Sequence, residues 1–328
     1  MSSVPRRASR SSSAGSLGSS REEIALSGYW KRFRHRCELV GVRFLAALPA
    51  ILPYRLSVKL GGLLGIVAFD IVRIRRRVTL DNLSRALGHR FGERERVRIG
   101  RRSYINFAKS MVEFASLGRL KPDTLRRLVT LHGREHLDGV LSRGRGAVIV
   151  TGHFGSWELL GAAAVAHGFP ADFLVGEQSN RLVDDLMNRL RSSAGIGIIA
   201  RGIAARGVFA SLKKNRVVAL LSDQDARRAG IFVDFFHAAA STYPGAAEFA
   251  YRVNCPIVFC YIVRCSDETH EAFFDPPIEV RTGAEREEEV ERLTAAHTEA
   301  LERCATRYPD HYFWAHRRWK TKPPPPAD

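Results

Sequence analysis

The spacing of apolar residues changes near residue 147. From there on, short apolar runs alternate with longer stretches in which apolar residues recur every three or four positions. A short apolar run is typical of a buried strand, and the longer spacing is typical of a helix with one buried face. Strands alternating with helices predict an α/β fold with a mixed, largely parallel sheet flanked by helices. The predicted strands are 147–151, 171–175, 196–200, 217–221 and 256–263, with helices at 181–194 and 203–214.

Two further stretches carry the helical spacing. Residues 78–132 show apolar positions at three- and four-residue steps throughout, which predicts a helical region before the sheet begins. Residues 284–307 read as one charged amphipathic helix, acidic in its first turns and basic in its last, as the helix dipole favours.

Residues 37–72 are apolar but interrupted by charged residues and prolines, so neither half reaches the roughly 20 apolar residues of a clean membrane span. Basic clusters at 29–36 and 73–77 flank this stretch. Two soluble core helices are one interpretation. We favour a membrane-embedded or interfacial helical hairpin, because aromatic and basic residues flank it as headgroup anchors do. Residues 28–77 are therefore a predicted membrane-anchoring segment.

Both ends of the chain differ in composition from the rest. Residues 1–27 are rich in Ser and Arg and nearly free of apolar side chains, so we expect a disordered tail. No apolar stretch follows the first arginines, which argues against a signal peptide. Residues 323–328 form a Pro-rich tail. The catalytic domain is accordingly predicted at 78–322.

The charge of the chain points to polyanionic partners. Fifty-one Lys and Arg against 34 Asp and Glu give a net charge of +17 over 328 residues. Nucleic acid, anionic lipid and an acidic carrier are all compatible with this charge. The five cysteines show no zinc-binding or disulfide spacing, which indicates reduced thiols in a reducing compartment.

The stretch VIVTGHFGSWELLG, residues 148–161, carries the candidate chemistry. His153 follows a predicted buried strand, at the edge where functional groups gather in α/β sheets. Glu158 stands five positions later, about 140° away on a regular helix, so the two meet only if His153 precedes the helix. A histidine held by a carboxylate is a general base. A loop histidine that only caps its neighbours is the alternative on local evidence.

Three ordered blocks resemble a known family. GHFGSWE resembles the HxxxxD/E motif of the lysophospholipid acyltransferase superfamily, in the form found in the late acyltransferases of lipid A biosynthesis. Residues 212–250 are similar to that family's strand–DQD–Gly–Phe-Phe–Thr-x-Gly segment, and HYFWAHRRWKTKP resembles its C-terminal signature. Together the blocks cover roughly residues 147–323. The resemblance implies transfer of a fatty acyl chain from a carrier thioester to a hydroxyl of a membrane lipid.

The same resemblance implies roles for single residues. His153 would deprotonate the acceptor hydroxyl and Glu158 would orient it. Arg201, in IIARG, would hold an anionic acceptor, although a surface arginine after a strand remains the alternative. Asp223, Gln224 and Asp225 would lie beside the acceptor, with a solvated turn after the strand as the alternative. His316, Arg317 and Arg318 would contact phosphate or the carrier, with a basic helix end as the alternative.

The chemistry implied needs no cofactor and no metal, because a thiolate leaves readily once a base and an oxyanion site are in place. The implied partners are acyl carrier protein or acyl-CoA, an anionic glycolipid acceptor and membrane lipids, without nucleic acid. The implied location is the bacterial inner membrane, with the catalytic domain facing the cytoplasm. An apolar groove for the acyl chain is expected around Phe232, Phe235 and Phe236, with ordinary core residues as an equal alternative.

Other interpretations remain open. The acceptor can also be a phosphoinositide mannoside or another membrane lipid, since GEQSNRL replaces the Arg-Pro pair of many relatives near Glu177 and Gln178. A lipid hydrolase of similar architecture would need a G-x-S-x-G elbow before a helix, and none stands there. A nucleic-acid-binding protein would explain the charge but lacks a recognisable binding module. A catalytically dead scaffold is disfavoured by the presence of both His153 and Glu158.

Overall fold

The computed structural model describes residues 35–36, 39–41, 47, 49–176 and 178–324. Met1–Phe44 and Leu45–Asp328 are two separate compact units, and every element below belongs to the second. The predicted disordered tail lies outside the described residues, as do the beginning of the predicted anchoring segment, Glu177 and residues 325–328.

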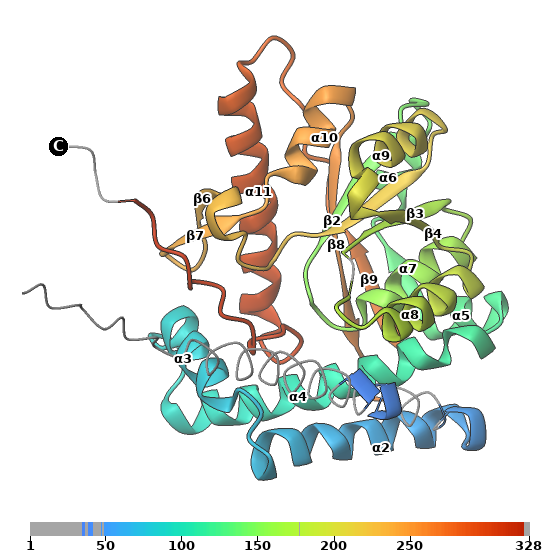
Figure 1. The fold of residues 1–328 in the computed structure, drawn as a ribbon, viewed down its shortest axis with the longest axis vertical. Coiled ribbons are helices and arrows are strands. Elements are labelled where there is room, and N and C mark those ends of the chain that lie inside the picture. The colour runs from blue at the N-terminus through green and yellow to red at the C-terminus, as the bar shows by residue number, and fades with distance from the viewer. Residues whose placement is uncertain (1–34, 37–38, 42–46, 48, 177, 325–328) are drawn as a thin grey trace, which may run out of the picture. The chain divides into compact units, whose positions relative to one another are not determined.

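The centre of the second unit is a seven-stranded mixed sheet (Figure 1). Its strand order is β1-β9-β8-β2-β5-β3-β4, and the five strands from β8 to β4 run parallel. The other two strands, β9 and the edge strand β1, run parallel to each other and antiparallel to these five. This confirms the predicted mixed, largely parallel sheet. The strands are β1 (Val129–His132), β2 (Ala147–Thr151), β3 (Ala171–Val175), β4 (Gly197–Ala200), β5 (Val217–Leu221), β8 (Ile257–Arg264) and β9 (His270–Phe274).

Helices cover both faces of this sheet, while α2 and α3 pack on α4. The helices are α2 (Tyr54–Ile66), α3 (Arg76–Leu87), α4 (Glu93–Ser116), α5 (Pro122–Leu128), α6 (Arg134–Leu141), α7 (Trp157–Ala166), α8 (Arg181–Ser193), α9 (Ala204–Lys213), α10 (Gly245–Val253) and α11 (Arg286–Arg307). Short helical turns η1 (Val67–Ile71), η2 (Leu117–Arg119), η3 (Arg201–Ile203) and η4 (Arg227–Ala229) join some of them. A separate two-stranded hairpin, β6 (Ile231–Asp234) and β7 (Ala239–Thr242), lies outside the large sheet.

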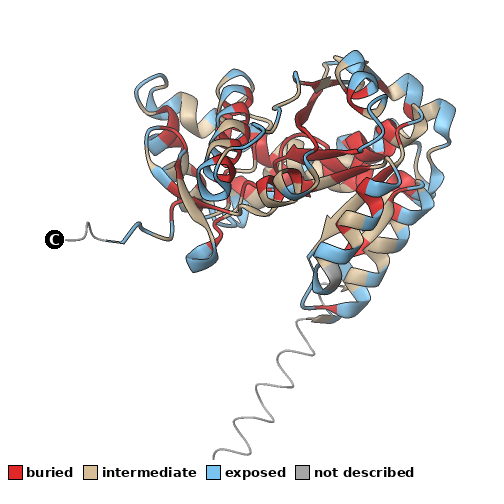
Figure 2. Ribbon diagram, turned by 90° about the horizontal axis from the view of Figure 1, so that it is seen from above, coloured by how far each residue is buried: buried red, intermediate tan, exposed pale blue. Residues whose placement is uncertain are grey.

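Side-chain alternation in β2 divides the core into two layers. Val148 and Val150 pack into the cluster that includes apolar residues of α9, α10 and α11. Ala147 and Ile149, which point to the opposite face, pack with α5, α6 and α7. Buried residues accordingly follow the central strands in Figure 2. A strand covered on both faces must be apolar at every position, which explains why the sequence shows unbroken apolar runs here.

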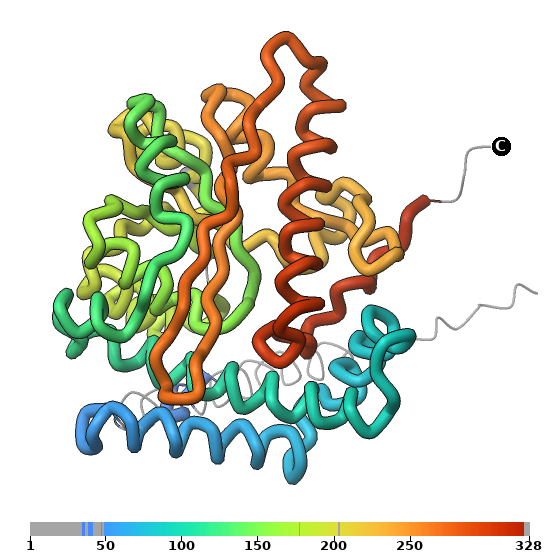
Figure 3. Tube along the Cα trace, turned by 180° about the vertical axis from the view of Figure 1, so that it is seen from behind, coloured from blue at the N-terminus to red at the C-terminus, as the bar shows by residue number. Residues whose placement is uncertain are grey.

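Four strands were not predicted from the sequence: β1, β6, β7 and β9. Residues 129–132, predicted to be helical, form the edge strand β1, in which Val129 is fully buried and Thr130 is exposed. This alternation, with β-branched residues, is the strand period and not the helical one. β9 and the β6–β7 hairpin were not predicted. Figure 3 shows β9 returning beside β8 as an antiparallel neighbour.

Helix α2 lies in the predicted anchoring segment and packs closely along α4 of the predicted catalytic domain (Figures 1 and 3). Two glycines make this close packing possible. A Cβ at Gly65 would lie 2.5 Å from the carbonyl oxygen of Tyr104, and one at Gly61 would lie 2.7 Å from Val112. The helix backbones therefore approach more closely than larger side chains would allow.

The face of α2 turned away from α4 is apolar and exposed, and the exposure continues through η1. Ile71, Val72 and Ile74 are 72%, 61% and 53% exposed, and Leu63 is 56% exposed. We call this the α2–η1 apolar face, with residues Leu56, Leu63, Leu64, Val67, Ile71, Val72 and Ile74. None of the helices in the described part of the chain is both long enough and apolar enough to span a bilayer.

Candidate active site

His153 and Asp223 meet at the ends of two neighbouring parallel strands. β2 and β5 pair in register, with Thr151 opposite Leu221. His153 lies two residues beyond Thr151, and Asp223 lies two residues beyond Leu221. The chain visits β3 and β4 before β5 enters the sheet beside β2. The pair thus occupies the carboxyl edge of the sheet at a change in strand order, where α/β folds place their ligands.

The Asp223 carboxylate holds both the ring and the backbone of His153. Its Oδ1 lies 2.8 Å from the imidazole Nδ1, and its Oδ2 accepts a hydrogen bond of 3.0 Å from the His153 backbone N–H. A carboxylate can only accept, so Nδ1 carries the proton and Nε2 keeps its lone pair. The Asp223 side chain is 2% exposed, whereas that of His153 is 20% exposed. The imidazole is therefore fixed on one side and accessible on the other.

These contacts also set the pKa values of the pair. Burial lowers the pKa of His153, but the charge and the hydrogen bond of Asp223 outweigh it, so the pKa is raised above its usual value. Burial raises the pKa of Asp223, and the charge and hydrogen bonds of His153 reverse the effect and lower it. Asp223 is thus ionised, and His153 is a stronger base than a free imidazole.

Two glycines shape the turn that carries His153. A Cβ at Gly152 would lie 2.9 Å from Leu301 and 3.3 Å from the Asp223 Cβ, so the absence of a side chain lets the acid approach. Gly155 has φ of +54°, and a Cβ there would clash with the carbonyl oxygen of Ile262. The turn therefore requires both glycines of the GHFG sequence.

The C-terminal segment pairs with the histidine turn. The backbone N–H of Phe313 donates to the carbonyl oxygen of His153 at 2.9 Å, and that of Gly155 donates to the carbonyl oxygen of His311 at 2.8 Å. The ring of Phe313 lies 6.2 Å from the imidazole, centroid to centroid, and the ring of Trp157 lies 5.0 Å from it, edge to face. Two aromatic rings thus lie beside the imidazole.

Glu158 is held by an arginine and not by His153. Its carboxylate accepts hydrogen bonds from Arg191 of α8, at 2.6 Å from Nη2 and at 3.0 Å from Nε. Both side chains are buried, at 4% and 10% exposure. The hydrogen bond that the sequence analysis expected from Glu158 is made by Asp223. Glu158 acts on the imidazole only through its charge, which also raises the pKa of His153.

The other two residues of the DQD block lie around the same base. The Gln224 Nε2 lies 3.5 Å from the His153 Nε2. The backbone N–H of Asp225 donates to the His316 Nε2 at 2.9 Å, and the Asp225 carboxylate accepts from the Thr321 hydroxyl at 3.0 Å. His316 therefore joins the C-terminal segment to the loop that carries Asp223.

Comparison with known proteins identifies the family of this chain. The family model described as bacterial lipid A biosynthesis acyltransferase matches residues 29–321. The chain belongs to this family. It is an acyltransferase of the lipid A type, as the sequence blocks predicted, and uses an acyl donor and a lipid acceptor.

Two distant relatives match most of the length of this acyltransferase, and a third matches about two fifths of it. A lipid A biosynthesis acyltransferase of Haemophilus influenzae is 24% identical over 86% of this chain and 87% of its own length. A lipid A biosynthesis palmitoleoyltransferase of Escherichia coli is 26% identical over 83% of this chain and 87% of its own. A phosphatidylinositol mannoside acyltransferase of Mycobacterium tuberculosis is 29% identical, over 38% of this chain and 41% of its own.

Three predicted arginines of the acyltransferase differ in placement. Arg201 in η3 is exposed, with its guanidinium carbon 5.3 Å from the centre of the Tyr243 ring. Arg317 is exposed, whereas Arg318 is 1% exposed. The Arg318 guanidinium binds the Ser241 carbonyl oxygen at 2.6 Å and the Thr242 hydroxyl. Arg201 and Arg317 are thus available to a ligand, while Arg318 has internal partners.

For two of the three phenylalanines, the structure favours the core alternative over an acyl groove. Phe235 and Phe236 are fully buried and pack on Trp319 and Trp314, so they are core residues. Sequence reasoning did not identify Trp157, Phe313 or Arg191. Trp157 stands inside the histidine motif, which was the available signal. Arg191 gave none, because one basic residue in an amphipathic helix resembles any other.

Proposed function

We propose that this acyltransferase moves a fatty acyl chain from a carrier thioester to a hydroxyl group of a lipid A precursor or a related anionic glycolipid. Acyl carrier protein or coenzyme A would supply the thioester. One observation carries the proposal: the Asp223 carboxylate binds the Nδ1 side of His153 at 2.8 Å. The lone pair of the accessible Nε2 is therefore free to take a proton.

In the proposed reaction, Nε2 of His153 takes the proton of the acceptor hydroxyl as its oxygen attacks the thioester carbonyl. A tetrahedral oxyanion forms, which we assign to amide donors in the first turn of α7, four residues after His153. The oxyanion then collapses, the carbon–sulfur bond breaks, and the thiolate leaves and takes the proton from His153. Asp223 stabilises the imidazolium throughout. No cofactor is required in these steps.

We assign the orienting role to Asp223 and a supporting role to Glu158. The Glu158–Arg191 pair joins the first turn of α7 to α8 and keeps a buried negative charge close enough to affect His153. Gln224 is proposed to position the acceptor beside Nε2, and Arg201 to hold an anionic group of the acceptor. Asp225 and His316 are proposed to shape the pocket through their mutual hydrogen bond.

We propose that the acyltransferase works at the cytoplasmic face of the bacterial inner membrane. The α2–η1 apolar face supports this, because large exposed side chains are followed at once by Arg73, Arg75, Arg76 and Arg77. Apolar side chains beside a basic cluster suit an interfacial helix on anionic lipid. The free cysteines at 255, 260, 265 and 304 suit the reducing side.

A phosphoinositide mannoside is the second candidate acceptor. Partial similarity to the mycobacterial phosphatidylinositol mannoside acyltransferase supports it. Both candidates are anionic lipids with sugar hydroxyls, so the proposed chemistry at His153 is the same for either.

The proposal is tested with purified full-length protein, acyl carrier protein or coenzyme A thioesters, and each lipid in mixed micelles, with products identified by mass spectrometry. We expect a gain of one acyl chain on the lipid A precursor. The His153→Ala variant should lose this activity by about 10²–10⁴-fold, the usual contribution of a general base. Retention of more than a tenth of the wild-type rate, with an unchanged melting temperature, would contradict the assignment of the base.

A further inference from the structure

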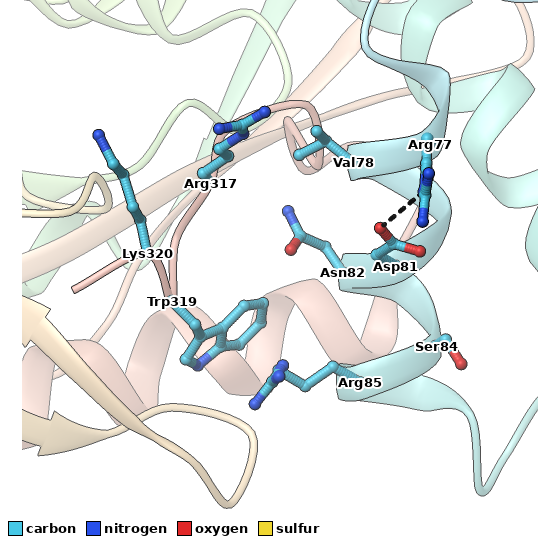
Figure 4. A pocket seen from close by; sticks show the side chains of 9 residues that line it. All are labelled: Arg77, Val78, Asp81, Asn82, Ser84, Arg85, Arg317, Trp319 and Lys320. Atoms are coloured by element: carbon cyan, nitrogen blue, oxygen red, sulfur yellow. Dashed lines mark ion pairs between the residues drawn. The ribbon is translucent and has the colours of Figure 1, made fainter. Parts of the chain in front are cut away.

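A basic groove lies between α3 and the C-terminal segment (Figure 4). Four of its side chains are cationic: Arg77 and Arg85 from α3, and Arg317 and Lys320 from the C-terminal segment. Its volume is about 840 Å³, enough for a headgroup. We call it the α3–C-terminal groove.

Most of the positive charge in this groove is not neutralised. Asp81 is its one carboxylate and reaches only Arg77, at 3.9 Å in an exposed pair. Within the described residues, Arg85, Arg317 and Lys320 have no ion-pair partner. Exposed cations with no nearby acid attract anions, and guanidinium groups match phosphate best.

Hydrogen bonds fix the two walls of the groove relative to each other. Asn82 of α3 donates hydrogen bonds to the carbonyl oxygens of Trp314 at 2.8 Å and His316 at 2.6 Å, which joins the two walls. The Trp319 ring is 7% exposed and its Nε1 binds the Phe235 carbonyl oxygen at 3.2 Å. Arg85 extends over this ring, 5.6 Å from its centre. The cationic side chains therefore project from a rigid part of the fold, so the protein loses less conformational entropy when a ligand binds.

The groove adjoins both the α2–η1 apolar face and the active site. Arg77 lies three residues beyond Ile74, the last residue of that face. On the other side, Arg317 follows His316, which accepts the hydrogen bond from Asp225 in the catalytic loop. A lipid could place its acyl chains on the apolar face, its charged headgroup in the groove and a nearby hydroxyl at the active site.

We propose that the α3–C-terminal groove binds a phosphate group on the headgroup of the acceptor lipid. This inference rests on the proposed function, because it adds a chemical feature to the acceptor. Phosphate is also present in both candidate donors. The acceptor is favoured, because the groove opens beside an apolar face, which a soluble donor does not need.

The test uses a phosphorylated lipid A precursor and the same lipid after phosphatase treatment, each at equal mole fraction in neutral detergent micelles. The variant Arg317→Ala/Lys320→Ala removes two cations from the groove. The control Arg189→Ala/Lys213→Ala removes the same two charges from α8 and α9, at exposed positions without ion pairs in the described chain. All three proteins should show equal melting temperatures, since each substituted side chain is exposed.

We expect the wild type to prefer the phosphorylated lipid. In the groove variant the ratio of kcat/KM for the two lipids should fall about tenfold or more, the effect of losing charge-assisted hydrogen bonds to phosphate. The control should keep the wild-type ratio. An unchanged ratio in the groove variant overturns the proposal. A raised KM for the thioester donor, with the lipid ratio unchanged, would assign the groove to the donor instead.

Equilibrium binding of the two lipids to His153→Ala protein, without donor, separates this inference from the proposed function. If no acyl transfer occurs to either lipid in the wild type, the proposed function fails. The groove proposal still stands if the His153→Ala protein binds the phosphorylated lipid more tightly and the added groove substitutions remove that preference. Equal binding of both lipids contradicts it.

Discussion

The carboxylate of Asp223 binds His153 twice, once at the ring Nδ1 and once at the backbone N–H, across 70 positions of sequence. The double contact fixes both the position and the rotation of the imidazole, which a single hydrogen bond would not do. It leaves Nε2 beside the Gln224 side chain, 3.5 Å from its Nε2. The acid of this catalytic pair is therefore Asp223, while the acid of the histidine motif, Glu158, is paired elsewhere.

Replacement of Asp223 by Asn should lower kcat/KM roughly a hundredfold, within the range of acid–base catalysis. The reaction needs neutral His153, so activity rises as pH rises through its raised pKa. Loss of the Asp223 charge should lower that pKa and move the acidic limb of the pH–rate profile to lower pH. A profile over pH 5–9 measures the shift. An acidic limb that stays in place would exclude Asp223 as the partner.

The Glu158–Arg191 pair should matter more for stability than an exposed pair. Arg191→Ala leaves the Glu158 carboxylate buried without its partner, which typically costs about 3–5 kcal/mol. Arg98→Ala is the control, because it breaks an ion pair with Glu95 that is 73% and 40% exposed and should cost below about 1 kcal/mol. Urea unfolding of the three proteins gives both values. Equal losses would show that burial does not strengthen this pair.

Arg201 should serve the acceptor and not the donor. We expect Arg201→Ala to raise the acceptor KM about ten- to a hundredfold, because a charge-assisted hydrogen bond contributes roughly 1.5–3 kcal/mol. The Arg201→Lys variant should recover little of the lost acceptor affinity if the contact is bidentate. Hydrolysis of the thioester by water, measured in parallel, should be unchanged. The control is Arg206→Ala, an exposed arginine in α9. Equal loss of transfer and hydrolysis would remove the acceptor role.

The α2–η1 apolar face should bind membranes. Ile71→Ser/Val72→Ser should reduce partition into anionic vesicles by at least about tenfold, because each buried aliphatic side chain contributes about 1.5–3 kcal/mol. Leu182→Ser in α8, 59% exposed before substitution, is the matched control and should partition as the wild type does. Sedimentation with vesicles in high salt isolates the apolar contribution. If the double variant sediments like the wild type, this face is not the membrane contact.

Local sequence was sufficient for the five parallel strands of the sheet and for the histidine turn. The apolar runs at 147–151, 171–175 and 217–221 match β2, β3 and β5 at both ends. Strands covered on both faces need such runs, so their burial can be recognised from the sequence. Gly152 and Gly155 likewise mark a turn that only glycine allows beside His153. The short edge strand β1 has a weaker apolar pattern, since four residues with one buried position resemble the end of a helix.

Partners that lie far apart in the chain were decided by the tertiary structure alone. Strand order places β5 beside β2, and this brings Asp223 to His153. Hydrophobic periodicity reports which face of a strand is buried, but it says nothing about which strand lies alongside. The same holds for Glu158 and Arg191, which are 33 positions apart and meet only in the folded chain.

The C-terminal residues show the same division within one short motif. The sequence indicates that the His316–Arg318 segment is basic, and it treats Arg317 and Arg318 alike. In the folded chain Arg317 lines an open groove, whereas Arg318 is buried against Ser241 and Thr242. An irregular segment has no periodic pattern, so its sequence does not report which of two neighbouring side chains is buried. The sequence by itself determined the chemistry of the side chains, and the fold decided which of them a ligand can reach.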